Sequence, residues 1–337
     1  MRLLIVGSTA PWAIERHYIR YLSQTGIDWK VFSPSDCIRR TLFNRILLRV
    51  GSMMPYKAAN EMLLRAADRF RPDVVWIFKG LEFHPETLLQ LKRHGMKLVN
   101  YNPDHPFIRT SVSNGGNNVA ACVQHYDLHF CYSRDLAARI EKEYRIPTVW
   151  LPFGFELDDP AFDSIEKSEE IVRVGFVGNP DRLRARIIRQ LAAKGLQVDV
   201  YGHHWPRFLR KHPNIRISDA VYGRQFWDTI RRYRVQLNIF RPYNAGSHNM
   251  RTFEIPAAGG IMLAPDSPEH RHFFTQDEEA FFYRSEEEIE QYCRKLLAMD
   301  NAGHIRDNAR RRSLGEDYSY RGRAILAYHS LNNLKSV

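Results

Sequence analysis

Short apolar runs alternate with amphipathic stretches through the first half of the chain. The apolar runs have the length of strands and occur at residues 3–7, 29–33, 73–80, 97–104, 127–133 and 148–154. Stretches of helical period lie between them, at about 12–24, 60–70 and 85–95, and the last ends at Gly95 as a helix C-terminus does. Such alternation is typical of right-handed βαβ units around a parallel sheet.

A second alternation begins at about residue 171. Strands are predicted at 172–179, 197–202, 235–240 and 260–265, and helices at 182–195, 223–233, 285–300 and 320–333. The stretch between the two alternations is acidic, contains a proline and has no periodicity, which predicts a linker. We therefore expect an α/β protein with two doubly wound domains: residues 1–155, a linker at 156–170, a second domain at 171–317 and a terminal helix at 318–337.

Composition and charge agree with this division. The 337 residues are too many for one ordinary core and suit two domains of about 150 residues each. A formal net charge of +11 attracts nucleotides, nucleic acid or an anionic membrane face. The cysteines show no CxxC spacing, so we expect neither a zinc ribbon nor a disulfide framework. The first apolar run is too short for a signal peptide, and no run approaches about 18 apolar residues, which predicts a cytoplasmic protein without a membrane span.

In the first half, polar residues follow the ends of predicted strands, where sheets of this kind bind ligands. Gly7 and Ser8 follow the first strand and permit a close approach of backbone to a ligand, although a plain strand-to-helix turn is the alternative. Asp104 and His105 follow the fourth strand between two prolines. A carboxylate and an imidazole on a stiff loop suit the deprotonation of an acceptor hydroxyl. An Asx-type turn with an incidental histidine is the alternative here.

In the second half, two strand ends carry candidate residues for binding a phosphorylated ligand. The first strand is followed by Gly178, Asn179, Arg182 and Arg184. Helix amides and guanidinium groups together would bind a diphosphate, and a solvated helix face is the alternative. The next strand is followed by His203 and His204, which could stack on a base or sugar. A metal site is less favoured, because adjacent histidines point apart and no acidic residue completes a ligand set nearby.

The segment "NMRTFEIPAAGG", residues 249–260, predicts a short helix that begins near Asn249. Arg251 and Glu254 are three apart and so share one face of that helix. A glutamate there can accept hydrogen bonds from a ribose diol, while an arginine offers its planar fork to phosphate. An ordinary intrahelical ion pair is the alternative.

This segment, together with "VGFVGN", "VYGRQFWDTI", "VQLNIF" and "KLVNYNPDHPF", resembles the CgeB-like (spore-maturation-type) glycosyltransferases, relatives of the family 4 enzymes of GT-B fold. The resemblance runs from about residue 73 to the terminal helix and is strongest over 171–264. It implies two facing Rossmann-like domains, an acceptor domain followed by a nucleotide-sugar domain, and a final helix that crosses back to the first domain. It also implies transfer without a metal, which agrees with the lack of a DxD element.

The resemblance carries over to some positions and not to others. Glu254 occupies the place of the glutamate that holds the donor ribose in family 4 enzymes, but their second glutamate, eight positions earlier, is Gly246 here. In those enzymes an Arg and a Lys grip the diphosphate. Asn179 stands at the first of these places and Arg182 or Arg184 near the second, so the clamp is matched in part.

We therefore expect a glycosyltransferase that moves a sugar from a nucleoside-diphosphate sugar, such as a UDP-sugar, to a hydroxyl of a glycan or a lipid-linked acceptor in polysaccharide biosynthesis. The resemblance implies a retaining reaction with no cofactor and no metal. The charge adds peripheral contact with the anionic inner membrane face, and nucleic acid is less favoured. The alternatives are a nucleotide-binding protein without transferase activity and a glycosyltransferase acting on modified DNA. An oxidoreductase is disfavoured, because neither half carries GxGxxG followed by an acidic residue.

Overall fold

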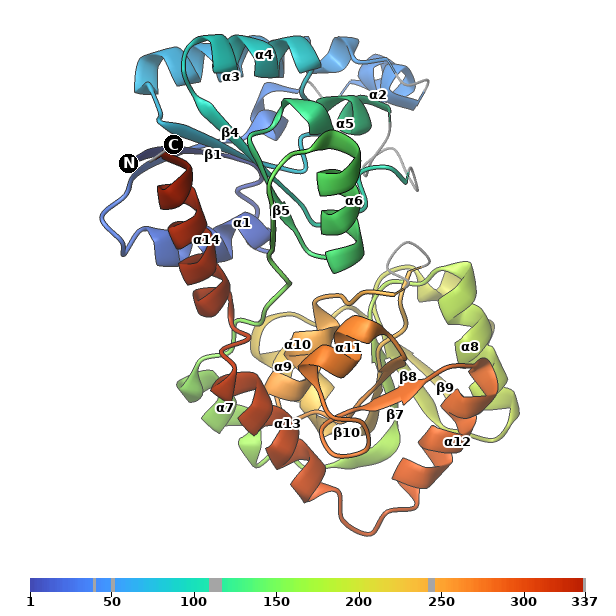
Figure 1. Cartoon of the computed structure of the whole chain (residues 1–337). Helices are drawn as coiled ribbons and strands as arrows, with labels where there is room; N and C mark the ends of the chain where they lie inside the picture. Colours follow the sequence, from blue (N-terminus) through green and yellow to red (C-terminus); the bar gives the residue numbers. More distant parts are fainter. Residues whose placement is uncertain (39–40, 50–51, 109–116, 242–245, 336–337) are drawn as a thin grey trace. The chain divides into compact units, whose positions relative to one another are not determined.

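The computed structural model describes residues 1–38, 41–49, 52–108, 117–241 and 246–335 (Figure 1). The chain divides into two compact units. The first unit comprises Met1–Pro152 together with Tyr320–Val337, and the second comprises Phe153–Ser319. Each unit is an α/β structure built on one six-stranded parallel sheet.

The sheet of the first unit has the strand order β2-β1-β3-β4-β5-β6. Its strands are β1 (Arg2–Val6), β2 (Asp28–Phe32), β3 (Val74–Phe78), β4 (Lys97–Asn102), β5 (Leu128–Cys131) and β6 (Thr148–Trp150). The central strands β3, β4 and β5 are continuous runs of buried residues, as expected where helices cover both faces of a parallel sheet. The edge strands β2 and β6 are only partly buried.

Helices and 3₁₀ turns connect these strands. They are α1 (Ile14–Leu22), η1 (Pro34–Cys37), α2 (Leu42–Arg49), η2 (Met54–Tyr56), α3 (Lys57–Phe70), α4 (Pro85–Arg93), α5 (Asn117–Cys122), η3 (Val123–His125) and α6 (Arg134–Tyr144). The last helix of the chain, α14 (Tyr320–Lys335), belongs to this unit and packs against α1. The rings of His17 and Tyr320 stack there with their centroids 4.3 Å apart.

The sheet of the second unit has the order β12-β11-β10-β7-β8-β9. Its strands are β7 (Ile171–Val177), β8 (Val198–Tyr201), β9 (Ile215–Ser218), β10 (Tyr233–Leu237), β11 (Met262–Pro265) and β12 (Phe281–Tyr283). Its helices are α7 (Asp159–Glu166), α8 (Arg182–Ala193), η4 (Trp205–Arg207), α9 (Gly223–Arg232), α10 (Arg251–Ala257), α11 (Pro268–Phe273), α12 (Glu286–Leu297) and α13 (Gly303–Gly315).

The stretch expected to be a linker, residues 156–170, instead contains α7 and lies inside the second unit. Asp158 caps this helix by accepting a hydrogen bond from the amide of Ala161 at 3.0 Å. Phe162 and Ile165 are buried on its inner side, which packs on α9. The sequence does not predict this helix, because its buried face consists of only these two residues, and two apolar positions do not make a recognisable helical pattern.

Each sheet has one point at which the strand order reverses. In the first sheet the reversal lies between β1 and β3, and in the second it lies between β7 and β10. Loops that leave two such strands diverge and open a crevice at the carboxyl ends of the sheet, which is where ligands of doubly wound proteins bind. Among the residues that the structure describes, no helix is long and apolar enough to cross a membrane.

Candidate functional site

In the second unit, the loops after β7 and β8 meet closely at Gly178. The Gly178 amide donates to the Tyr201 carbonyl at 2.8 Å, and its own carbonyl accepts from the Trp205 indole at 3.0 Å. A Cβ atom on Gly202 would lie 2.3 Å from that same carbonyl oxygen. Gly202 also has a φ of +156°, which residues with a side chain rarely adopt. A glycine is therefore needed both to avoid the clash and to allow this backbone conformation.

Asn179 joins the two loops beside Gly178. Its Oδ1 accepts a hydrogen bond from the backbone amide of His203 at 3.0 Å. The imidazole Nε2 of His203 lies 2.8 Å from the hydroxyl of Tyr222, and His204 is exposed with a φ of +68°. The loops after β7 and β8 therefore bring together, at the carboxyl ends of these strands, Gly178, Asn179, His203 and His204.

Arg182 and Arg184, predicted to act together, contact different surroundings. Arg184 donates from Nε and Nη2 to the carbonyl of Ile239, at 3.1 and 2.8 Å, and from Nη1 to the carbonyl of Asn179 at 2.9 Å. It therefore ties the loop after β7 to the segment after β10. Arg182 makes no hydrogen bond or ion pair with the part of the chain that the structure describes.

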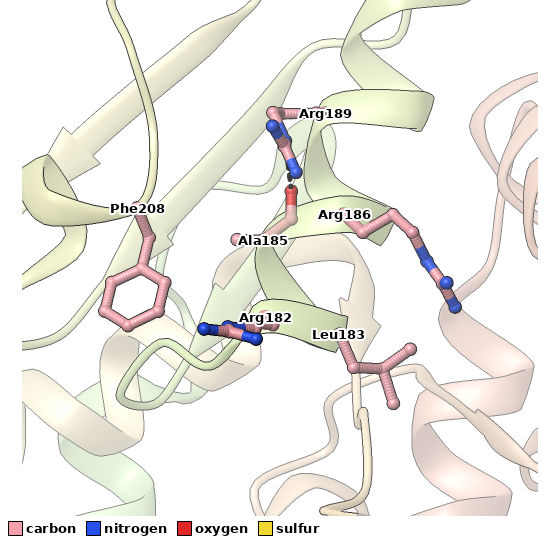
Figure 2. Close-up of a pocket in the computed structure, with 6 residues that line it drawn as sticks. All are labelled: Arg182, Leu183, Ala185, Arg186, Arg189 and Phe208. Atoms are coloured by element: carbon pink, nitrogen blue, oxygen red, sulfur yellow. Dashed lines mark hydrogen bonds between the residues drawn. The ribbon is translucent and has the colours of Figure 1, made fainter.

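Arg182 instead lines a hollow of about 500 Å³ along α8. Figure 2 shows that its side chain faces the ring of Phe208, while Arg186 and Arg189 extend from later turns of the same helix. Arg186 is paired with Glu286, and Arg189 donates from Nε to the carbonyl of Ala185 at 3.2 Å. Arg182 is therefore open to an anionic ligand, and Arg186 is not, because its charge is paired.

Arg251 and Glu254 form an ion pair on one turn of α10. The same guanidinium donates from Nε to the carbonyl of Val177, the last residue of β7, at 3.2 Å, and lies 4.4 Å from the centre of the Phe226 ring. The Glu254 residue is 8% exposed. Its Oε1 receives no hydrogen bond from the described residues, so one carboxylate oxygen remains available to a ligand.

A buried polar network supports the start of α10. The Oδ1 of Asn249 accepts from the amide of Thr252 at 3.2 Å, and its Nδ2 donates to Oδ1 of buried Asn238 at 2.7 Å. The hydroxyl of Thr252 lies 2.8 Å from Nε2 of His270, which has no exposed surface. Asn249, a predicted donor-binding residue, thus holds the start of the helix in place.

His270 is uncharged at neutral pH. Burial lowers the pKa of its imidazole from 6.5 to about 4. Its Nδ1 lies 2.7 Å from the carbonyl oxygen of Pro265, which can only accept, so Nδ1 carries the proton. Nε2 is then the acceptor for the hydroxyl of Thr252. The network has one arrangement of protons that satisfies all its members.

In the first unit, the turn after β1 encloses a carboxylate that the sequence did not suggest. The amide of Ser8 donates to Oε1 of Glu15 at 2.8 Å, and Glu15 is 7% exposed. A Cβ atom on Gly7 would lie 2.5 Å from the same oxygen. Burial raises the pKa of Glu15, and the hydrogen bond from Ser8 opposes this shift. Gly7 therefore has a structural reason for being a glycine, and Ser8 contributes its backbone amide.

Lys79, directly after β3, pairs with Asp104 and also acts electrostatically on Glu15. Its ammonium group lies 2.8 Å from Oδ2 of Asp104, and its charge also lowers the pKa of Glu15 and of Glu82. Burial nevertheless keeps the pKa of Glu82 above its ordinary value. One lysine thus pairs with one carboxylate and acts electrostatically on two others near the strand-order reversal of the first sheet. We call Glu15, Lys79, Glu82 and Asp104 the acidic cluster.

His105 does not share this environment. Its Nδ1 accepts from the amide of Phe107 at 3.3 Å, and the pKa of its imidazole is lowered by burial and by the nearby charge of Arg139. The carboxylate of Asp104, by contrast, pairs with Lys79. Its backbone amide donates to Oδ1 of Asn102 at 3.0 Å, which forms an Asx turn. The two residues predicted as a catalytic pair therefore contact separate groups.

Comparisons with known proteins agree with this architecture. Residues 182–327 match a family model described as "Glycosyl transferase-like". The match confirms the expected enzyme class, a glycosyltransferase, while the finer CgeB-like type stays a prediction. No curated protein matches the sequence.

Solved structures share the fold along the whole chain. Sucrose-phosphate synthase from Thermosynechococcus elongatus is similar with a TM-score of 0.74 and 12% identity, covering 100% of both chains. A glycosyltransferase from Rickettsia africae has a TM-score of 0.69 and 13% identity over 99% of this chain and 98% of the other. HepE from Anabaena in complex with UDP has a TM-score of 0.68 and 10% identity over 99% and 100%. The expected GT-B fold is confirmed.

Sequence reasoning missed several residues that shape these sites. Glu15 lies in α1, Lys79 directly follows β3, and Glu82 lies between β3 and α4. Charged residues at strand ends were the available signal for Lys79. Asn238 and His270 carried no such signal, because their role depends on pairing across distant segments. Among the described residues, no group of three His, Cys, Asp or Glu side chains is placed to hold a metal ion.

Proposed function

We propose that the protein transfers a sugar from a nucleoside-diphosphate sugar, such as a UDP-sugar, to an acceptor hydroxyl. The observation that carries this proposal is the Arg251–Glu254 pair, which is tied to the end of β7 beside Gly178. A carboxylate and a guanidinium at a strand-order reversal suit the ribose diol and the diphosphate of such a donor. Structures of HepE with UDP and with UDP-glucose, which share the fold, support this choice of donor.

In the proposed complex, the second unit binds the donor. Glu254 accepts hydrogen bonds from the ribose hydroxyls through its available oxygen, and Arg251 turns part of its fork from Glu254 to the diphosphate. Arg182, at the first turn of α8, adds a second cation. Gly178 and Asn179 bring backbone close to the phosphates, and His203 and His204 contact the base or the sugar. Arg184 and Asn249 maintain the loops around them.

The proposed reaction forms a bond between the acceptor oxygen and the anomeric carbon, while the bond from that carbon to the diphosphate oxygen breaks. Negative charge then develops on the leaving diphosphate, where Arg251 and Arg182 stabilise it without a metal. The acceptor proton passes to Asp104 or to His105, whose lowered pKa leaves it unprotonated at neutral pH. We propose a retaining outcome, as in the family 4 relatives, in which the acceptor oxygen bonds to the face of the anomeric carbon that the diphosphate leaves.

The acidic cluster favours a polyhydroxylated acceptor in the first unit. Carboxylates accept hydrogen bonds from sugar hydroxyls, while they repel the phosphates of nucleic acid. A glycan or lipid-linked acceptor, used in the cytoplasm at the inner membrane face, therefore fits better than DNA. A nucleotide-binding protein without transferase activity is the second candidate, because Gly246 stands where family 4 enzymes carry a glutamate.

The proposal is tested by a panel of nucleotide sugars. We expect one donor class to raise the melting temperature, because a ligand that binds the native state alone stabilises it. We also expect the purified protein to release the nucleoside diphosphate from that donor, slowly with water and faster with an acceptor. Stabilisation without release would favour the non-enzymatic candidate. No stabilisation by any nucleotide sugar would overturn the proposal.

A further inference from the structure

Helix α2 in the first unit has large apolar side chains that nothing in its own fold covers. None of its residues is buried, and Leu42, Phe43 and Ile46 are 72%, 61% and 51% exposed. Met54, in the adjacent turn η2, is 66% exposed. A soluble surface normally carries such residues singly, so their gathering within one short segment requires an explanation.

The spacing places these side chains on one side of α2. At about 100° per residue, Leu42, Ile46 and Phe43 fall within an arc of about 100°, and Arg49 and Arg45 follow next to Leu42 on one flank of that arc. The helix begins with a cap at Thr41, whose Oγ1 accepts from the amide of Asn44 at 3.1 Å. The exposed face is therefore an apolar strip bordered by arginines.

The charge of this region has one sign. Arg45 and Arg49 are exposed and form no ion pair with the residues that the structure describes. From Thr41 to Tyr56 the sequence contains Arg45 and Arg49, and no aspartate or glutamate. An isolated apolar strip beside unpaired arginines is complementary to a surface that is both apolar and anionic.

We propose that α2 docks the protein on an anionic phospholipid membrane. Leu42, Phe43 and Ile46 enter the boundary between headgroups and acyl chains, and the arginines contact lipid phosphates, with their stems along the apolar surface. The apolar contact alone binds a membrane weakly. Attraction between the arginines and anionic lipids adds to it and raises the affinity for the membrane. A second copy of the chain fits less well, since two such faces would bring like charges together.

This docking surface lies outside the donor residues. Membrane docking would give the proposed enzyme a location in the cell. The docking proposal does not depend on the proposed function, because membrane binding and nucleotide binding are measured separately. It also places the first unit, with the acidic cluster, beside a membrane in which a lipid-linked acceptor would reside. Vesicle binding by this surface is measured without an acceptor.

The experiment is sedimentation of the full chain with vesicles. Vesicles of phosphatidylcholine mixed with phosphatidylglycerol are compared with vesicles of phosphatidylcholine alone, at low and high salt. We expect binding to the anionic vesicles that weakens as salt rises. The Phe43→Gln/Ile46→Gln variant should lose this binding, and Gln is chosen because it keeps helix propensity. The Arg45→Gln/Arg49→Gln variant should lower the partition coefficient by about fivefold per arginine removed.

Matched controls come from the same unit. Ile325→Gln/Leu326→Gln removes two exposed apolar residues of α14, and Arg65→Gln/Arg69→Gln removes two exposed arginines of α3. Both should bind vesicles as the natural protein does, and all variants should keep its melting temperature and nucleotide affinity. Equal binding by the Phe43/Ile46 variant, or no binding by the natural protein, would overturn the proposal. A dimer in ultracentrifugation that the Phe43/Ile46 change dissociates would assign the face to a second copy instead.

Discussion

The guanidinium of Arg251 pairs with the carboxylate of Glu254 while its Nε donates to the carbonyl of Val177 at 3.2 Å. The pair therefore joins α10 to the carboxyl end of β7, where the strand order of the second sheet reverses. An intrahelical ion pair on an exposed surface contributes only a few tenths of a kcal/mol. This pair is largely shielded from solvent, so its polar groups must be satisfied by each other or by a ligand.

Replacing Glu254 by Gln should weaken the binding of nucleoside diphosphates. The change keeps the size of the side chain but removes the charge that strengthens a hydrogen bond to a ribose hydroxyl, which costs about tenfold or more in affinity. Titration calorimetry with UDP and other nucleoside diphosphates measures this. The control is Glu278→Gln. Glu278 is exposed and precedes the amino end of β12, whereas the proposed donor residues lie at the carboxyl ends of their strands. Unchanged affinity in Glu254→Gln would remove this residue from the donor site.

Replacing Arg182 should affect ligand binding, whereas replacing Arg184 should affect the stability of the fold. Arg184→Met removes three hydrogen bonds to the carbonyls of Ile239 and Asn179 and should lower the free energy of unfolding by about 1–3 kcal/mol. Arg182→Met should leave stability within about 0.5 kcal/mol and weaken diphosphate binding. Denaturant unfolding and calorimetry on both variants provide the comparison. Equal destabilisation by the two changes would contradict it.

The divergence of these arginines was predictable in principle. Residues two apart on a helix lie about 200° apart around its axis, so Arg182 and Arg184 could not face the same ligand from α8. The pattern of apolar runs predicted the central strands because each is a continuous buried run. It missed β9 and β12, which are edge strands of only a few residues, and α7, whose buried face is formed by Phe162 and Ile165.

Some of the residues at the candidate sites could be found from the sequence, and others could not. Gly178, Asn179 and Asp104 follow strands directly, so the rule that ligands bind at the carboxyl ends of parallel strands was enough to find them. Glu15 lies within α1 and turns back to the amide of Ser8, a contact that depends on the angle between helix and strand. The separation of His105 from Asp104 depends likewise on Phe107 and Arg139, which no local pattern connects.

Gly7→Ala should disturb the turn after β1. The added methyl group would lie 2.5 Å from Oε1 of Glu15, so the carboxylate must move and its hydrogen bond from Ser8 is lost. We expect the free energy of unfolding to fall by about 1–3 kcal/mol. Gly315→Ala is the control, because no atom lies within 4 Å of the added group and its φ is not positive. If both variants unfold at the same denaturant concentration as the natural protein, the contact has no energetic importance.

Asp104→Asn and His105→Gln should lower transfer while leaving nucleotide affinity unchanged. Both residues lie in the first unit, and each is proposed to accept the acceptor proton. Loss in Asp104→Asn alone assigns the proton to Asp104, and loss in His105→Gln alone assigns it to His105. Turnover is followed by the release of nucleoside diphosphate with acceptor present, and binding by calorimetry. Full activity in both variants would place the base elsewhere.

Acid should destabilise the second unit through His270. The pKa of this imidazole is about 4 in the folded chain and 6.5 in the unfolded chain, so the unfolded chain binds the proton more tightly. The contribution of His270 to the free energy of unfolding is therefore complete above pH 6.5. It falls by about 3 kcal/mol in total as the pH drops from 6.5 to 4. His129, with a folded pKa of about 4, has the same effect in the first unit.

The measurement is denaturant unfolding of the natural protein and of His270→Gln between pH 7 and pH 4. At pH 7 the variant should be less stable, since Gln cannot reproduce both the bond to the Pro265 carbonyl and the bond from Thr252 in the same geometry. Its stability should fall less steeply with acid than that of the natural protein, because one titrating group is missing. Parallel pH profiles for the two proteins would show that His270 is not the group responsible.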